Sequence, residues 1–295
     1  MSGAVWAAAS GVGFGVFQSL NRRAIAAMDV QLATFLQLVI ACVVLVAVAG
    51  AAGDAGRVRD APAAAIAYFV AGGLIHFFAG WTLLNMSQKR IGAARTSPLI
   101  ATTPMFGVAV AFVMLGELPG PLAWLGILLI TAGAYGVAVG RLGPATGAAS
   151  WRDSSFGLGT AFAWSISPVL IRKGLEGLNS PLLGLTLGLI AAVLVFGATL
   201  PFRRVSLLHE PVVWDALSFK VLAGVFVALS TWGRWIALDE TGIGVVLALG
   251  LLSVPVVLFL SPVLMGRHVE HVSAQIWLGA LLVIVGSLLL VARTL

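Results

Sequence analysis

The feature that most constrains this chain is a succession of apolar stretches, each roughly 20 residues long and separated by short polar breaks. A helix of that length crosses the hydrocarbon of a bilayer, which is about 30 Å thick. The sequence predicts ten such membrane spans, five in each half of the chain. We place them at residues 2–20, 31–50, 62–84, 92–115, 121–140, 155–171, 181–201, 215–238, 242–265 and 272–292.

Composition supports an integral membrane protein. Hydrophobic residues make up 60% of the 295 residues and charged residues only 9%, and the mean hydropathy is +1.07. Polar side chains are too few to cover a soluble globule of this size. The net charge of +6 does not indicate nucleic acid binding, because the basic residues stand in pairs between apolar stretches, as interface anchors do.

The second half of the chain repeats the first. The decamer at 124–133 recurs at 277–286 with six of its ten letters identical, and at an offset of 150 Arg22 corresponds to Arg172. A constant offset with small drift indicates a duplication. Because each half holds an odd number of spans, the two copies must cross the bilayer in opposite directions, which is the inverted-repeat plan of many transporters.

We therefore divide the chain into a first five-helix repeat at 1–142, a linker at 143–153 and a second five-helix repeat at 154–295. The expected fold is all-α: ten transmembrane helices arranged as two inverted repeats around a central cavity. No stretch indicates a separate soluble domain, and we expect a monomer.

The charges of the loops bear on orientation. Loops after odd-numbered spans, counting Lys220 with them, hold 11 Lys or Arg, against five in the other loops and the tail. The positive-inside rule then puts both termini outside. However, the pairs at 22–23 and 172–173 are repeat equivalents that must lie on opposite faces, so part of this charge signal cancels.

Few ionisable side chains lie within the spans. All 11 carboxylates fall in loops or within a turn of a span end, so no acidic proton relay crosses the bilayer. The chief exceptions are His76 and Arg234, and the cost of burying such groups makes each a site candidate. Arg234 lies about one turn from Asp239, so it can snorkel or pair locally. His76 lies too deep to snorkel, so it must make an interhelical hydrogen bond or line a polar cavity.

Small and aromatic residues mark the same depth. Gly80 follows His76 by one turn, and small residues on that face permit close helix packing or leave room for a ligand. Trp164 lies at mid-depth in the sixth span, and its repeat equivalent is Phe14, which stands between two glycines. We expect the two rings to form an aromatic wall on a pseudo-symmetry axis.

The fourth and ninth spans each contain a proline at corresponding positions, Pro104 and Pro255. Proline removes a helical hydrogen bond and kinks its helix. The freed carbonyls need partners, and Thr102, Thr103 and Ser253 are close enough to supply them or to face a wet cavity. We expect these two kinked spans to move during alternating access.

The residues 115–117 followed by 126–133, together with the proline of the fourth span, resemble the ending of the EamA repeat. The whole chain resembles a ten-helix member of the drug/metabolite transporter superfamily, and within it the YddG-type amino acid exporters. This resemblance implies a central cavity lined by spans of both halves. It also implies that His76 and Trp164 stand at the positions that line it.

The resemblance further implies an inner-membrane protein with cytoplasmic termini, and we prefer this orientation to that of the charge count. Two departures leave the substrate open. Residues 101–103 precede the proline where the family can carry aromatics, and residues 266–268 replace the Leu-Gly-Glu ending in the second half.

Other classes of function lack their residues in this sequence. An intramembrane enzyme would need paired aspartates or a deep metal-binding motif, and the metal-like run at 268–271 is expected to be a solvated loop. We expect no enzyme, no cofactor and no metal. A proton-coupled cation antiporter of the small four-helix type needs a membrane-embedded carboxylate, which this chain lacks.

The sequence therefore favours an alternating-access transporter of small amphipathic metabolites, most of all an exporter or facilitator of aromatic and other neutral amino acids. A multidrug or nucleoside effluxer of the same superfamily and a structural membrane subunit stay open. The expected partners are a small-molecule solute and the lipid bilayer. The candidate residues are His76, Trp164, Gly80, Thr103 and Ser253 for substrate binding, Pro104 and Pro255 as hinges, and Phe14 and Arg234 as secondary contacts.

Overall fold

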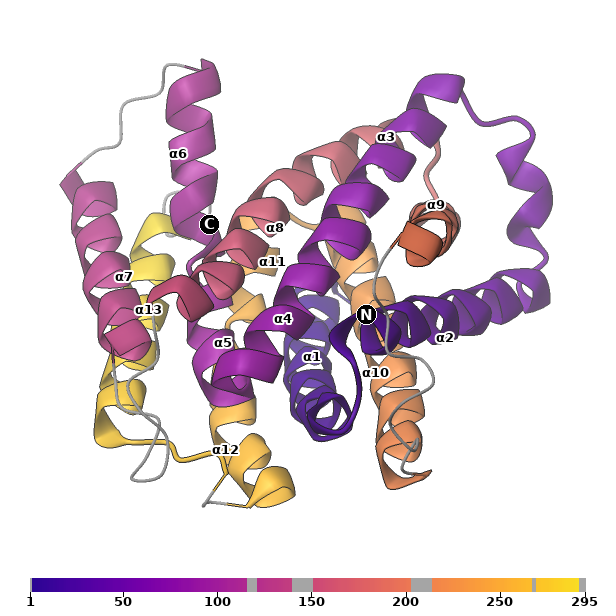
Figure 1. The fold of residues 1–295 in the computed structure, drawn as a ribbon. Helices are drawn as coiled ribbons and strands as arrows, with labels where there is room; N and C mark the ends of the chain where they lie inside the picture. The colour runs from indigo at the N-terminus through magenta and orange to yellow at the C-terminus, as the bar shows by residue number, and fades with distance from the viewer. Residues whose placement is uncertain (1, 116–120, 140–150, 203–213, 267–268, 292–295) are drawn as a thin grey trace.

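The computed structural model describes residues 2–115, 121–139, 151–202, 214–266 and 269–291, and these are almost entirely helical, with no β-strand among them (Figure 1). The α-helices are α1 (Gly3–Ala26), α2 (Val30–Ala51), α3 (Ala63–Gly73), α4 (Thr82–Ile91), α5 (Ala93–Ile100), α6 (Thr103–Leu115), α7 (Pro121–Val139), α8 (Trp151–Gly177), α9 (Pro181–Thr199), α10 (Trp214–Glu240), α11 (Ile243–Gly250), α12 (Ser253–Met265) and α13 (Ala274–Val291). Two 3-10 turns, η1 (Asp54–Val58) and η3 (Leu200–Phe202), and a π-helical segment, η2 (Leu74–Trp81), complete the described elements.

Seven of the described helical stretches are long and apolar enough to cross a membrane: Gly3–Ala26, Val30–Ala51, Ala63–Ile91, Trp151–Gly177, Pro181–Phe202, Trp214–Glu240 and Val245–Met265. Two shorter apolar stretches, Trp124–Val137 and Ala274–Leu289, belong to α7 and α13. The remaining predicted span corresponds to α5 and α6. The chain is therefore an all-α, multi-pass membrane protein, as the sequence predicts.

Polar side chains at two interfacial turns explain where helices begin. The Asp29 carboxylate accepts hydrogen bonds from the Gln31 and Leu32 amides at 2.8 and 3.2 Å, and so caps the start of α2. Ser180 caps α9 in the same way, and Pro181 follows it at the first helical position. These groups satisfy amides that a helix start otherwise leaves without partners.

The repeated decamers pack directly against each other, because they lie in α7 and α13. A Cβ added at Gly133 would stand 2.5 Å from the Gly279 carbonyl oxygen, and one at Gly286 would stand 2.6 Å from that of Gly126. The early part of each helix thus meets the late part of the other, so the two helices run antiparallel. Without side chains at these positions, the two backbones approach closely.

Helices of the two halves also cross over one another. In the first half α1 packs on α10, α11 and α12, and in the second half α8 packs on α3, η2, α4, α5 and α6. The Ser10 hydroxyl, for example, donates to the Ser230 carbonyl at 2.7 Å. The first span of each half therefore contacts the third and fourth spans of the other half.

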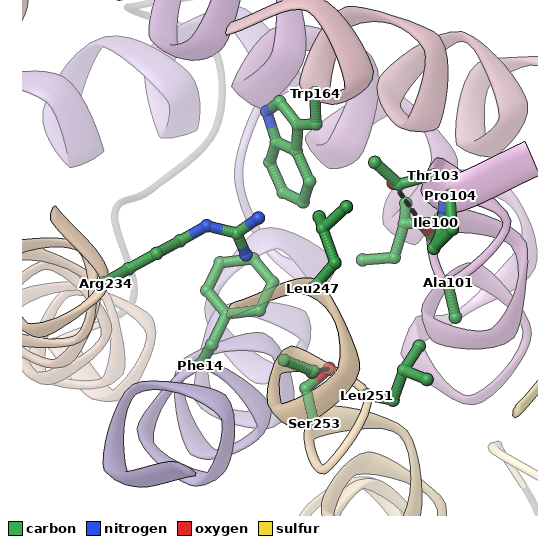
Figure 2. A pocket seen from close by; sticks show the side chains of 11 residues that line it. Phe14, Ile100, Ala101, Thr103, Pro104, Trp164, Arg234, Leu247, Leu251 and Ser253 are labelled. Atoms are coloured by element: carbon green, nitrogen blue, oxygen red, sulfur yellow. Dashed lines mark hydrogen bonds between the residues drawn. The ribbon is translucent and has the colours of Figure 1, made fainter. Parts of the chain in front are cut away.

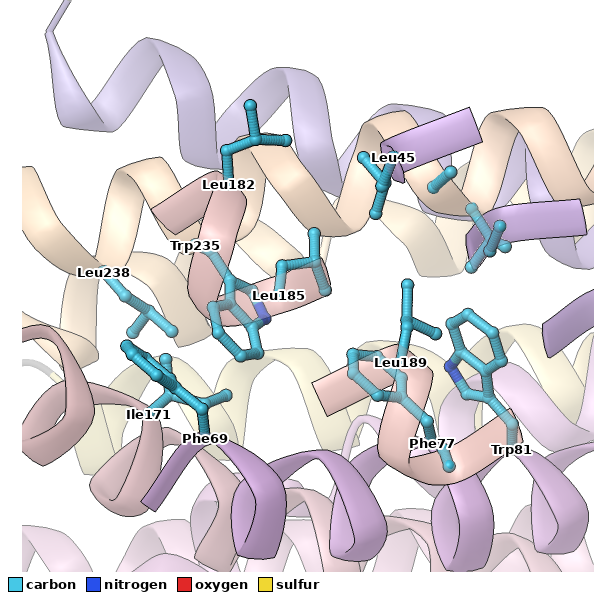
Figure 3. Close-up of a cluster of buried hydrophobic side chains, with 14 of the residues drawn as sticks. Leu45, Phe69, Phe77, Trp81, Ile171, Leu182, Leu185, Leu189, Trp235 and Leu238 are labelled. Atoms are coloured by element: carbon cyan, nitrogen blue, oxygen red, sulfur yellow. The ribbon is translucent and has the colours of Figure 1, made fainter. Parts of the chain in front are cut away.

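An aromatic core holds the third span in place (Figure 3). Phe69 stacks on Trp235 with ring centroids 5.8 Å apart, and Phe77 meets Trp81 edge-on at 4.9 Å. All four rings are fully buried, and leucines of α9 pack beside them. In a bilayer the exposed alternative for such side chains is lipid rather than water, so the gain comes from close van der Waals packing, and this packing anchors the π segment beside α8.

Candidate functional site

The fourth and ninth spans are each broken near the middle. The first of these spans stops at Ile100 and resumes at Thr103; the other stops at Gly250 and resumes at Ser253, so the two breaks are 150 positions apart. Each proline lies in the first turn of the helix that resumes, where its missing N–H has no intrahelical partner to lose. The kinks predicted from the prolines thus take the form of helix breaks.

Hydroxyl groups satisfy the carbonyls at both breaks. The Thr103 hydroxyl donates to the Ile100 carbonyl at 2.6 Å, and the Ser253 hydroxyl donates to the Gly250 carbonyl at 2.9 Å. Thr102 makes the same bond to Leu99 at 2.7 Å. The expectation that these side chains supply partners for freed carbonyls is confirmed.

A cavity with about 400 Å³ of empty volume, including its open side, lies between the two breaks (Figure 2). Its lining combines apolar side chains with two hydroxyls and one cationic side chain. The residues come from α1, α8, α10 and the two broken spans: Phe14, Ile100, Ala101, Thr103, Pro104, Trp164, Arg234, Leu247, Gly250, Leu251 and Ser253.

Phe14 and Trp164 meet in the wall of this cavity. Their ring centroids are 5.4 Å apart with the planes at 70°, an edge-to-face contact. One ring belongs to the first span of the first half and the other to the first span of the second half. The structure brings together the aromatic pair that the repeat offset predicts.

Trp164 is held from behind by the π segment η2. Its indole nitrogen donates to the His76 carbonyl at 3.1 Å, and its ring stacks on the imidazole with centroids 5.1 Å apart. Gly80 lies directly against the indole nitrogen, where a Cβ would clash. π-helical segments occur frequently at functional sites, and here the segment positions an aromatic side chain.

His76 itself lies behind Trp164 rather than in the cavity lining. It is 5% exposed, and its Nδ1 shares a 2.9 Å hydrogen bond with the Ser167 hydroxyl of α8. Of the residues selected from the sequence, Trp164, Thr103, Ser253, Pro104, Phe14 and Arg234 line the cavity. His76, Gly80 and Pro255 stand outside the lining.

Arg234 extends from α10 towards the cavity, and its guanidinium group points between Phe14 and Trp164 (Figure 2). A Cβ added at Gly250 would stand 3.5 Å from its Nη1. The local pairing with Asp239 suggested by the sequence is not present, and Arg234 makes no hydrogen bond or salt bridge to another described residue. It is the only formally charged residue in the described lining.

A second polar cluster, which the sequence analysis missed, surrounds Lys220. This lysine is fully buried, and its ammonium group donates to Asn21 at 2.5 Å and to Gln37 at 3.0 Å. Asn21 in turn donates to Asn85 and Gln88 at 2.7 and 2.6 Å. The charge pattern groups Lys220 with a loop because it lies near the start of its apolar stretch. The sequence signal for the cluster is the set of amide side chains in or next to three other spans, namely Asn21, Gln37, Asn85 and Gln88.

We call the end of the bundle where α1, α4 and α12 finish the polar end. It carries ion pairs between Arg22 and Glu270 at 3.5 Å, Arg23 and Asp215 at 3.2 Å, and Arg90 and Asp153 at 2.7 Å. Glu270 is only 5% exposed and also accepts from the Ser261 hydroxyl. The expectation of a solvated loop is therefore wrong at Glu270, because the loop folds back onto α1 and α12. His268 lies outside the described residues.

Comparison with known proteins gives a family match for the first part of the chain and a solved structure of similar fold. Residues 1–139 match the profile of the EamA-like transporter family. A solved structure, titled only as a protein crystal structure, aligns over 98% of this chain and 98% of its own with a TM-score of 0.59 and 20% sequence identity. A search of the curated proteins gave no match.

Proposed function

We propose that this protein is an alternating-access transporter that moves small amphipathic metabolites through the cavity between the two broken spans. The observation that carries the proposal is the composition of the cavity wall: equivalent residues of both halves, Phe14 with Trp164 and Thr103 with Ser253, face one space. A site at the interface of two repeats can open to either side when one repeat rocks against the other. The match of residues 1–139 to a transporter family agrees with this function.

The two halves, 1–142 and 154–295, are in this proposal inverted repeats joined by the linker 143–153. Three observations support it: the antiparallel glycine contacts of α7 with α13, the crossed packing of α1 and α8, and breaks 150 positions apart. Pro104 and Pro255 then mark equivalent hinges, because a helix break concentrates changes of backbone angle in a few residues.

Neutral amino acids, aromatic ones first, are the proposed solutes, and export or facilitated movement is the proposed mode. Trp164 and Phe14 offer apolar ring surfaces, while Thr103 and Ser253 offer hydroxyl oxygens. His76 and Gly80 act on the solute through Trp164, which they hold in place. A multidrug or nucleoside effluxer with the same fold is the second candidate, because the wall is largely apolar.

For orientation, we propose an inner-membrane monomer with both termini in the cytoplasm. Among the described basic residues that favour the opposite orientation, Arg22, Arg23 and Arg90 pair with carboxylates at the polar end and Lys220 is buried among amides. These side chains hold helices together. Their positive charge is therefore weaker evidence for which side of the membrane this end of the protein faces. A C-terminal reporter active only in the periplasm tests this orientation, and strong activity would contradict it.

Transport itself is tested with the purified protein in liposomes. Vesicles preloaded with an unlabelled solute are diluted into its labelled form, and counterflow uptake is measured for amino acids, nucleosides and lipophilic cations in turn. We expect saturable counterflow of aromatic and other neutral amino acids that empty vesicles do not show. Counterflow limited to lipophilic cations or to nucleosides would favour the second candidate, and none with any solute would overturn the proposal.

A further inference from the structure

Building on the proposed transport function, we propose that the cavity selects solutes by a carboxylate group, which pairs with Arg234, and that an amino group on the solute is dispensable. The solute class is then apolar monocarboxylic acids, with or without an amino group. The geometry that points to this is a guanidinium between two aromatic rings, in a wall whose other described residues are uncharged (Figure 2).

Arg234 has the position that such a role requires. Its guanidinium group reaches the cavity from α10 and lies beside the end of α11 at Gly250, close to the break in the ninth span. Among the described residues it has no hydrogen-bond or ion-pair partner, so its N–H donors are available to a solute. A guanidinium presents a planar fork of donors that matches both oxygens of a carboxylate.

The energetics favour an anionic occupant. A cation inside a membrane protein is costly unless an opposite charge or a set of acceptors compensates it. Other basic side chains show such compensation: Arg22 pairs with Glu270, and Lys220 donates to two amide oxygens. Arg234 has neither an opposite charge nor a hydrogen-bond acceptor among the described residues. A carboxylate that enters the cavity supplies both.

The same wall offers an ammonium group no opposite charge. No described lining residue is acidic, so an ammonium would find only the hydroxyl oxygens of Thr103 and Ser253 as polar side-chain acceptors. One face of Trp164 is covered by His76, which reduces the ring surface open to a cation. An amine without a carboxylate would also meet the like charge of Arg234. A phosphate dianion would leave one negative charge unpaired, because only one of the described lining residues is cationic.

Four probes that share one phenyl ring test the inference: phenylalanine, 3-phenylpropionate, phenethylamine and phenylalanine amide. Equilibrium binding of each is measured at pH 7 on the purified protein in lipid nanodiscs. We expect the two carboxylates to bind within about threefold of each other and the two compounds without a carboxylate at least about tenfold more weakly, as expected for losing a charge-assisted pair. Amines that bind as tightly as the acids, or acids that do not bind, would overturn the inference.

Substitutions of Arg234 test whether its positive charge and its fork of donors hold the carboxylate. Arg234→Gln should weaken binding of both acids at least about tenfold, and Arg234→Lys should retain part of it, because lysine keeps the charge but not the fork. Arg172→Gln, which removes an exposed arginine outside the cavity lining, is the matched control and should bind as wild type. Acids that bind to Arg234→Gln as to wild type would contradict the proposal. If Arg234→Gln does not fold, the order of the affinities of the four probes for the wild-type protein decides whether the cavity selects a carboxylate.

Counterflow of the same probes distinguishes this inference from the proposed function. If the acids bind in the expected order but show no counterflow, the proposed transport function is contradicted and the carboxylate site is supported. If counterflow is equal for phenylalanine and phenylalanine amide, the transport function is supported and the carboxylate site is contradicted.

Discussion

The indole nitrogen of Trp164 donates a hydrogen bond to the backbone carbonyl of His76, 3.1 Å away, and so joins α8 to the π segment of the third span. The same pair stacks ring on ring. The histidine therefore acts on the cavity through the tryptophan that it supports. Contacts behind the cavity wall, as well as in it, should control the affinity for the solute.

The first prediction concerns Gly80, which lies against that indole. In Gly80→Ala the added methyl group would collide with the Trp164 nitrogen, so the ring must shift and the cavity wall with it. We expect solute binding about tenfold weaker, because a small displacement of a positioning group has a large effect. Equilibrium binding measures this effect. The control is Gly136→Ala in α7, where an added Cβ meets nothing within 4 Å. Equal affinity in the two variants would contradict the role of Gly80.

A second prediction separates the ring of Trp164 from its N–H group. Trp164→Phe keeps an aromatic ring but leaves the His76 carbonyl without its donor, so thermal unfolding should show a loss of about 1 kcal/mol. Trp164→Ala also removes packing against Phe14 and His76 and should cost about 3–5 kcal/mol. Binding should fall in the same order. An alanine variant as stable as the phenylalanine variant would show that the ring is not packed as described.

How far the sequence could predict the fold depends on whether a feature is local. Span positions follow from stretches of apolar residues, and the predicted span 181–201 matches the helical stretch Pro181–Phe202. The equivalence of Phe14 with Trp164 follows from the repeat offset, and the structure adds that the two rings are in contact. Both inferences need only the spacing of residues along the chain.

Side-chain direction and loop folding could not be predicted in this way. The depth of His76 leaves an interhelical hydrogen bond and a place in the cavity lining both open, and only the family resemblance implies the lining. Its direction depends on the π segment, which changes the register of the helix, and the structure shows the hydrogen bond to Ser167. Lys220 lies one to two turns inside its helix, and only the amides of other spans make its burial tolerable. The sequence predicts that Glu270 lies in water, yet it is buried and paired with Arg22 of α1.

A third prediction tests the hydroxyls at the two breaks. Thr103→Val and Ser253→Ala each remove the donor to a carbonyl at the end of the preceding helix. Each should lower the free energy of unfolding by about 1 kcal/mol, the typical net value of such a bond. Because the two sites are structurally equivalent, the two losses should be similar, and chemical unfolding in detergent measures them. Thr131→Val in α7 is the control, since its exposed hydroxyl bonds within an unbroken helix. A loss as large in the control would contradict the special role of the breaks.

The fourth prediction concerns the cluster around Lys220. Lys220→Met keeps the length of the side chain but leaves the Asn21 oxygen without its donor, and the Gln37 oxygen with only the longer bond from Asn85, in a fully buried network. We expect a loss of about 2–3 kcal/mol, since each unsatisfied buried group costs about 1–3 kcal/mol. Thermal unfolding should show no comparable loss for Lys173→Met, which changes an exposed lysine. A Lys220→Met variant as stable as wild type would mean that the hydrogen bonds of Lys220 contribute nothing to the stability of the fold.

The central claim is that solute passes through the cavity between the two breaks, and a thiol placed in its wall tests this most directly. The protein carries Ser253→Cys after its single cysteine is removed by Cys42→Ala, and counterflow is measured in liposomes before and after reaction with a small thiol reagent. We predict that the reagent abolishes counterflow and that excess solute slows the labelling. Undiminished counterflow after complete labelling would contradict the account, as would labelling at the same rate with and without solute.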